Sequence, residues 1–207
     1  MLILFGGTFD PIHIGHIALA NTLYDNFQHT VTFMPTGLQT YKKPPVATAT
    51  QRLEMLNLTI ANNKNFNIDT LEILSKETCN TYKTLSTIRK KIGKETPIFF
   101  LIGSDSLITL DSWDNWQDLL NLTNFIVAKR PEFNLDKTQT KVAFEFNKRK
   151  TLIVNKNITH GTFYLMNFTP INISSTQIRH NIKNNKPITN LVPSYIEQYI
   201  LNKGIYK

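Results

Sequence analysis

The first 35 residues restrict the fold most, because their pattern is that of a β-α-β unit. Residues 2–5 form a short apolar run that ends at a glycine pair, which is typical of a buried parallel strand. A stretch with one apolar stripe at helical spacing follows, carried by Ile17, Ala20, Leu23, Tyr24 and Phe27. Residues 31–34 are a second apolar run, which Pro35 closes. Since parallel β-α-β crossovers are right-handed, this opening predicts one topology.

Strand-like and helical stretches go on alternating along the chain. The further strand-like runs are residues 66–68, 97–102, 125–128 and 163–168. The further helical patterns are residues 53–60, 82–92 and 113–120, with two closing helices that start near Ser175 and near Pro193. This alternation predicts an α/β fold, with a Rossmann-like, mainly parallel sheet, helices on both of its faces and helices at the C-terminus.

The length of the chain and the lack of a low-complexity linker predict one domain over residues 1–207, with a C-terminal helical part from about residue 174. Residues 132–160 fit two interpretations. Val142, Phe144 and Phe146 alternate as in a strand, whereas the basic residues around them also fit a helix. The sequence leaves this choice open.

The composition excludes several classes of protein. The single cysteine, Cys79, rules out an intrachain disulfide framework. The N-terminus lacks the basic start and the long apolar core of a signal peptide. No apolar run approaches the roughly 18 residues that a membrane span requires. We therefore expect a cytoplasmic protein without a membrane partner.

The chain carries a net charge of +8, which favours polyanionic partners. Its basic residues are scattered, and the small groups at residues 42–43, 89–91 and 148–150 are most simply solvated faces. The charge alone does not separate a nucleotide enzyme from a nucleic-acid-binding module. Because no nucleic-acid-binding motif is present, we expect no stable nucleic-acid partner.

Residues 6–16, Gly-Gly-Thr-Phe-Asp-Pro-Ile-His-Ile-Gly-His, are the most specific segment. The two glycines allow backbone amides to approach an anion, and the N-terminus of the following helix favours phosphate. His13 and His16 flank Gly15, so a ligand can approach between the two rings. The segment is neither a Walker A loop nor a dinucleotide-binding G-x-G-x-x-G loop. Because no third or fourth ligand accompanies the histidines, we expect phosphate binding and no metal site.

The segment 6–16 resembles the signature of the HxGH nucleotidyltransferase superfamily. Within that superfamily, the chain is similar over nearly its whole length to the bacterial nicotinate-nucleotide adenylyltransferases, and the similarity weakens over residues 132–160. Residues 173–179 match the family's I-S-S-T-x-I-R motif. The other matching positions are residues 102–107 in an I-G-x-D segment, Trp113, Arg130 and Pro131. The resemblance implies a nucleotidyltransferase that uses ATP.

The resemblance also implies a role for each matching residue. His13, His16 and Arg179 would be the catalytic residues, which stabilise charge on the ATP phosphates. The further ATP-binding residues implied are Gly6, Gly7, Thr8, Phe9, Lys42, Gly103, Asp105, Ser175 and Thr176. The mononucleotide-binding residues implied are Thr81, Tyr82 and Trp113. The Trp113 ring would stack on the pyridine, and Lys83 stands where the family often has threonine.

The reaction implied by the resemblance transfers AMP from ATP to nicotinate mononucleotide. It gives nicotinate adenine dinucleotide and pyrophosphate, a step of NAD biosynthesis. ATP and the mononucleotide would be the partners of the chain. Mg²⁺ would be the cofactor, held by the ATP phosphates and not by protein ligands.

Several alternatives stay open at this point. Other HxGH transferases act on nicotinamide mononucleotide or make dephospho-coenzyme A or a CDP-alcohol. Residues 13–16 also spell the HIGH motif of class I aminoacyl-tRNA synthetases, although the chain has no recognisable KMSKS loop. A non-catalytic, basic nucleic-acid-binding domain is an alternative from another class. The sequence leaves the choice between nicotinate and nicotinamide, and the oligomeric state, open.

Overall fold

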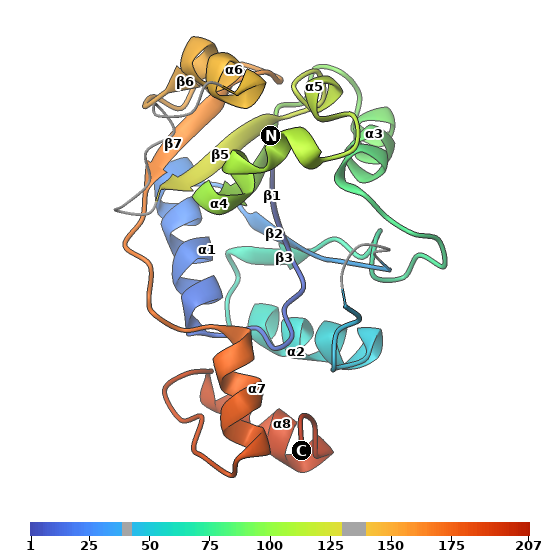
Figure 1. The fold of residues 1–207 in the computed structure, drawn as a ribbon, viewed down its shortest axis with the longest axis vertical. Helices are drawn as coiled ribbons and strands as arrows, with labels where there is room; N and C mark the ends of the chain where they lie inside the picture. Colours follow the sequence, from blue (N-terminus) through green and yellow to red (C-terminus); the bar gives the residue numbers. More distant parts are fainter. Residues whose placement is uncertain (39–42, 130–139) are drawn as a thin grey trace. The chain divides into compact units, whose positions relative to one another are not determined.

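The computed structural model describes residues 1–38, 43–129 and 140–207, in which strands alternate with helices (Figure 1). The strands are β1 (Leu2–Gly7), β2 (Val31–Pro35), β3 (Phe66–Ile68), β4 (Ile98–Gly103), β5 (Asn124–Lys129), β6 (Lys150–Thr151) and β7 (Phe163–Asn167). The helices are α1 (Ile14–Phe27), α2 (Ala49–Ala61), α3 (Thr81–Ile92), α4 (Ser104–Ile108), α5 (Trp116–Leu119), α6 (Lys141–Arg149), α7 (Ser175–Lys183) and α8 (Ser194–Lys203), with a 3₁₀ turn η1 (Leu110–Ser112). In these described ranges the strands form a seven-stranded parallel sheet in the order β3-β2-β1-β4-β5-β7-β6. The predicted α/β class with a mainly parallel sheet is confirmed.

The chain divides into two compact units. The first comprises residues 1–6 and 79–169, and the second comprises residues 7–78 and 170–207. Each unit is assembled from two segments that are far apart in the sequence. No linker marks such a division, so it leaves no signal in the composition of the chain.

The first unit is centred on β4. This strand pairs in parallel with β1 and with β5, and β5 pairs in turn with β7. Residues 98–102 are all buried, as expected for a strand covered on both faces. The rings of Phe125 and Phe163 stack beside it, with their centroids 5.4 Å apart. Gly103 ends β4 and so marks the carboxyl edge of this unit.

Arg89 is a buried residue of the first unit, although its sequence neighbours suggest a solvated basic face. Its guanidinium donates hydrogen bonds to the carbonyl oxygens of Gly93, Lys94, Thr96, Leu122 and Thr159. Five carbonyl partners replace the water that the cation loses on burial. The expectation of a solvated face is therefore wrong for Arg89, while Lys90 and Lys91 are exposed.

The second unit combines β2 and β3 with helices from both ends of its sequence. α2 begins with a capping box, in which Thr48 and Gln51 each bond the other's backbone amide through their side chains. α8 packs against α2, where the Tyr199 hydroxyl donates to Glu54. The C-terminal helices thus belong to the same unit as the loop that follows β1.

Helix α6 decides between the two interpretations of the region after residue 140. Its N-cap, Thr140, accepts a hydrogen bond from the Ala143 amide. Val142, Ala143 and Phe146 are buried, whereas Phe144 is 68% exposed. This is the three-to-four-residue spacing of a helix with one buried face, so the strand interpretation is wrong.

The helix expected over residues 113–120 is shorter than predicted. Trp113 has an extended backbone, and α5 begins only at Trp116. Asn115 takes a left-handed conformation with φ of 51°, which a helix cannot continue through. Within the described ranges, no helix combines the length and the apolar composition that crossing a bilayer requires.

Candidate active site

The loop that follows β1 is held by its own packing. A Cβ atom at Gly7 would lie 2.7 Å from the Phe9 ring, so a larger residue would displace that ring. Phe9 has a positive φ of 51° and is 1% exposed, with its ring edge-on to the His16 ring. The Phe9 side chain therefore packs against His16 and does not face a ligand.

His13 and His16 lie at the start of α1 with their rings stacked, at a centroid distance of 3.7 Å. The expectation that a ligand approaches between the two rings is therefore wrong, because stacked rings in contact leave no space between them. Gly15 permits this arrangement, since a Cβ atom there would lie 3.1 Å from the His13 ring. The structure describes every residue in the first turn of α1, and this turn has no side-chain cap and no acidic residue. The Ile14 amide already donates to the Leu191 carbonyl, and the His16 amide donates to the His13 carbonyl. A bound anion would supply the charge opposite to the helix dipole that this N-terminus lacks.

Both imidazoles are neutral at pH 7. Burial lowers the pKa of His13 to about 4, and its Nδ1 has no hydrogen-bond partner among the described residues. Burial also lowers the pKa of His16 well below 6.5, and the nearby His13 lowers it further. The His16 Nδ1 atom is buried even though part of the residue is exposed. Because a neighbouring anion favours the protonated ring, the pair is suited to respond to phosphate.

The low pKa of His13 predicts that acid destabilises the fold. The unfolded chain takes up a proton on this residue near pH 6.5 and the folded chain only near pH 4, so lowering the pH across this interval favours unfolding. At pH 5 we expect His13 to reduce the free energy of unfolding by about 2 kcal/mol relative to pH 8. Urea unfolding followed by circular dichroism at the two pH values measures this change.

Two variants isolate the contribution of His13 to this pH dependence. His13→Gln removes the titrating group, so its free energy of unfolding should change less between pH 8 and pH 5. His180→Gln, at an exposed position on α7, should behave as the wild type does. If His13→Gln and the wild type showed the same pH dependence, the buried neutral state of His13 would be contradicted.

Asp10 is the centre of a buried polar cluster in the second unit. Its carboxylate accepts hydrogen bonds from the Val46 and Ala47 amides at 2.8 and 3.0 Å and from the Tyr206 hydroxyl at 2.7 Å. The Arg179 guanidinium donates to the Asp10 carbonyl at 2.7 Å and lies 3.7 Å from the carboxylate. Asp10 is only 4% exposed, which a carboxylate tolerates when it has several partners. The cluster ties the loop to Arg179.

The N-terminus of α7 lies against the same loop. The Ser175 hydroxyl donates to the Pro11 carbonyl at 2.9 Å. Arg179 donates a second hydrogen bond to the Thr176 hydroxyl at 3.2 Å. The helix is capped by the preceding residue, Ser174, whose side chain accepts from an amide of the first turn. The structure thus brings the predicted residues of α7 to the loop, and it assigns the capping role to Ser174.

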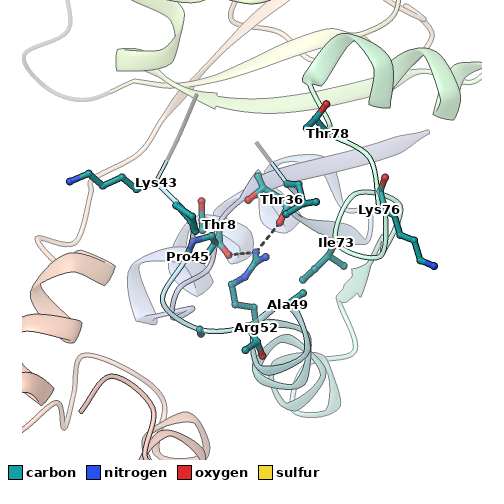
Figure 2. A pocket seen from close by; sticks show the side chains of 15 residues that line it. Thr8, Thr36, Lys43, Pro45, Ala49, Arg52, Ile73, Lys76 and Thr78 are labelled. Atoms are coloured by element: carbon teal, nitrogen blue, oxygen red, sulfur yellow. Dashed lines mark hydrogen bonds between the residues drawn. The ribbon is translucent and has the colours of Figure 1, made fainter. Parts of the chain in front are cut away.

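A cavity of about 760 Å³ opens beside Thr8 in the second unit (Figure 2). Its lining also includes residues from the segments 36–38, 43–49 and 73–78. Lys43 and Lys76, which are both exposed, lie among these lining residues. The volume is within the range of small-ligand sites, roughly 300–1,000 Å³. The cavity therefore has the size and the positive charge to take a small anionic molecule.

Arg52 forms the wall of this cavity next to the loop. Its guanidinium donates to the carbonyls of Thr8 and Thr36, at 2.9 Å in both cases (Figure 2). Burial lowers the pKa of this arginine, which is 3% exposed. Its Nε has no hydrogen-bond partner among the described residues. The positive charge of this arginine favours an electronegative group on this side of the cavity.

Three residues of the site, Asp10, Arg52 and Tyr206, are not predicted from the sequence. The sequence does suggest that Asp10 is buried, because it stands between Phe9 and Ile12 in an apolar stretch. A charged residue in such surroundings needs polar partners. Nothing in the sequence indicates which residues those partners are.

The first unit contains the other predicted ligand residues. Gly6 lies in β1, and Asp105 is exposed in the first turn of α4. A Cβ atom at Gly103, the last residue of β4, would meet no atom within 4 Å. Packing within the protein therefore does not explain this glycine, whereas the close approach of a ligand would.

The start of α3 is joined to the segment around Trp113 in the same unit. Asn80 caps α3 by accepting from the Lys83 amide at 2.8 Å, and it donates to Asp114, also at 2.8 Å. The predicted mononucleotide-binding residues at this junction are Thr81, Tyr82 and Trp113, all half-buried. Because the cap already uses the Lys83 amide, a ligand would have to contact other amides of this turn.

The described residues of the site offer hydrogen-bond donors and positive charge. Among the residues that the structure describes, no group of three or more His, Cys, Asp or Glu side chains could hold a metal ion. Lys42 and the pair Arg130-Pro131 lie outside the described residues. Imidazoles, arginines and a helix N-terminus without a side-chain cap form a set that binds phosphate groups.

The chain is similar to known proteins over most of its length. Residues 4–181 match the cytidylyltransferase-like family. Proteins from Yersinia enterocolitica and Buchnera aphidicola, both named "Probable nicotinate-nucleotide adenylyltransferase", are 35% and 34% identical to the chain. The matches cover 99% of this chain in both cases, and 94% and 95% of the two relatives.

A solved structure supports the fold. It is titled "Plasmodium falciparum nicotinic acid mononucleotide adenylyltransferase complexed with NaAD" and has a TM-score of 0.74 to this chain at 20% identity. The likeness covers 99% of this chain and 96% of that one. At this level of identity the likeness concerns the Rossmann-like fold.

Proposed function

Because the chain belongs to the cytidylyltransferase-like family and, within it, to the nicotinate-nucleotide adenylyltransferases, we propose that it transfers AMP from ATP to nicotinate mononucleotide. The products are nicotinate adenine dinucleotide and pyrophosphate. The observation that carries this proposal is the pairing of two features in the second unit. The uncapped N-terminus of α1 bears His13 and His16, and Arg179 is fixed to the same loop through Asp10.

This reaction needs charge stabilisation more than proton transfer. The phosphate of the mononucleotide is already an anion, so its oxygen attacks the α-phosphorus of ATP directly while pyrophosphate leaves in line. His13 and His16 donate hydrogen bonds to phosphate oxygens, and Arg179 neutralises charge on the triphosphate. Catalysis is thus positioning plus charge neutralisation, and it requires no covalent enzyme intermediate.

Mg²⁺ would be held by the phosphates of ATP and would neutralise part of their charge. The residues at the loop fit this arrangement better than an ion held by the protein. Asp10 is the carboxylate nearest in sequence to the histidines, and its oxygens already face two amides, a hydroxyl and Arg179.

The remaining predicted residues divide between the two substrates. Backbone groups of residues 6–9 and the side chains of Ser175 and Thr176 serve the ATP phosphates. Gly103 and Asp105 serve the adenosine, for which the open space at Gly103 is the supporting observation. The mononucleotide is assigned to Thr81, Tyr82 and Trp113, near the junction made by Asn80 and Asp114. A phosphate contact of Lys42, one domain over residues 1–207 and a cytoplasmic location stay predictions.

Pyrophosphate release tests the proposal directly. Purified protein with Mg²⁺ and ATP is supplied in turn with nicotinate mononucleotide, nicotinamide mononucleotide and 4′-phosphopantetheine. We expect release with nicotinate mononucleotide at a kcat/KM at least tenfold above that with the other two acceptors. A preference for another acceptor would move the chain to another member of the superfamily, and release with none of them would refute the proposal.

Trp113→Ala is expected to raise KM for the mononucleotide by about tenfold and KM for ATP by less than twofold, because stacking on an aromatic ring is worth roughly 1–3 kcal/mol. Steady-state kinetics with each substrate varied in turn measures the two constants. Trp116→Ala is the matched control, since Trp116 is the other tryptophan of the chain and is also half-buried. Equal changes in both KM values for Trp113→Ala would identify a packing residue instead.

A further inference from the structure

The turn that follows α8 places Tyr206 in the interior of the second unit. The helix ends at Gly204, which has a left-handed φ of 62°. Tyr206 has a φ of 71°, a region that bulky side chains rarely occupy, and it is only 7% exposed. Such a conformation persists only where the surrounding structure holds it, so the contacts of the Tyr206 side chain must stabilise it.

The Tyr206 hydroxyl ends at the buried carboxylate of Asp10. It donates to Oδ1 at 2.7 Å, and the same oxygen accepts the Ala47 amide at 3.0 Å. The other oxygen, Oδ2, accepts the Val46 amide at 2.8 Å and faces Arg179 at 3.7 Å. Tyr206 and Arg179 therefore face different oxygens of the Asp10 carboxylate.

The hydroxyl remains a donor throughout the neutral pH range. Burial raises the pKa of Tyr206, and the charge and hydrogen bond of Asp10 raise it further. The nearby Arg179 and Arg52 lower it, but less than the other causes raise it. A neutral phenol thus offsets part of the carboxylate charge without adding a cation of its own.

This contact has a consequence for Arg179. Its guanidinium is held by the Asp10 carbonyl and faces the Asp10 carboxylate, in a place where it can also meet a phosphate group. Without the phenol, Oδ1 would keep only the Ala47 amide, and the less satisfied carboxylate would attract Arg179 more strongly. An arginine drawn toward a carboxylate is less available to an anionic ligand.

We propose that Tyr206 is a positioning residue of the triphosphate site, which acts through Asp10 on Arg179 and on the segment 46–47. This inference rests on the proposed function, in which Arg179 binds the ATP triphosphate. Tyr206 does not itself contact substrate. Its effect should appear in the binding of ATP and in turnover, and not in the binding of the mononucleotide.

Tyr206→Phe tests the inference, because it removes the hydroxyl and keeps the ring. We expect Kd for ATP, measured by isothermal titration calorimetry, to rise on the order of tenfold, since a hydrogen bond to a charged group is lost. KM for the mononucleotide should change less than twofold. The matched control is Tyr199→Phe, which removes a hydroxyl bonded to another carboxylate, Glu54, on the α2–α8 contact. That variant should lower the melting temperature and leave Kd for ATP unchanged.

A double-mutant cycle checks the path through Asp10. In an Asp10→Asn background, Tyr206→Phe should alter Kd for ATP less than twofold, because the carboxylate charge that the Tyr206 hydroxyl stabilises is gone. Circular dichroism establishes that each variant is folded. If Asp10→Asn does not fold, Arg179→Lys provides the second background, and the two changes should again be less than additive.

The outcomes separate the inference from the proposed function. A wild-type Kd for ATP in Tyr206→Phe, or an equal loss in Tyr199→Phe, would overturn the positioning role. Additive effects in the cycle would overturn the path through Asp10. If the wild type bound ATP but released no pyrophosphate with any acceptor, the proposed function would be refuted. The values of Kd for ATP would still test the positioning role of Tyr206. If the wild type did not bind ATP, both would fall.

Discussion

His16→Ala is expected to lower kcat by about 10²- to 10³-fold, the usual loss when one preorganised donor to a developing charge is removed. The His16 ring is stacked on His13 and supported edge-on by Phe9, so its direction is set before a ligand binds. Alanine at this position in the first turn of α1 keeps the backbone amides and removes only the imidazole. Steady-state release of pyrophosphate at saturating concentrations of both substrates measures the loss.

The control for this variant is His180→Ala. His180 is exposed on α7, directly after Arg179, and its replacement should leave kcat within twofold of the wild type. Thermal unfolding by circular dichroism must show that His16→Ala is folded at the assay temperature. A folded His16→Ala protein with a kcat near that of the wild type would remove His16 from the catalytic residues.

The fold class could be predicted because its signals are local in the sequence. The buried run of residues 98–102 ends at a glycine, and α3 ends at Gly93, which has the positive φ of 82° expected at a helix C-terminus. Periodicity and turn residues carry this information within a few positions. The role that the sequence suggests for Gly15 is wrong, since its missing Cβ allows the His13 and His16 rings to stack and leaves no space for a ligand between them.

The cluster around Asp10 could not be predicted, because its members are distant in the sequence. Tyr206 lies 196 positions from Asp10, and Arg179 lies 169 positions from it. Periodicity states which side of an element is buried, but not which polar groups from remote elements meet there. Arg52 and Arg89 were missed for a related reason, since an arginine in a helical pattern looks like a surface residue until its carbonyl partners are known.

Asp10→Ala is expected to lower the free energy of unfolding by about 3–5 kcal/mol, because it removes the acceptor of several hydrogen bonds and each buried donor left without an acceptor costs roughly 1–3 kcal/mol. The variant would leave the Arg179 charge without its carboxylate, and it would leave the Tyr206 hydroxyl and the amides of Val46 and Ala47 without acceptors. Each unsatisfied buried group adds to the loss. Urea unfolding at pH 7.5, followed by circular dichroism, gives the difference from the wild type.

Two further variants show which property of Asp10 matters. Asp10→Asn keeps an oxygen acceptor and the shape of the side chain while it removes the charge facing Arg179, so its loss should lie between those of the wild type and Asp10→Ala. Asp25→Ala, at an exposed position of α1, should change the free energy of unfolding by less than about 0.5 kcal/mol. If Asp10→Ala were as stable as Asp25→Ala, the cluster would not hold the loop. Arg179 would then be joined to the loop by its hydrogen bond to the Asp10 carbonyl, which every variant at this position keeps.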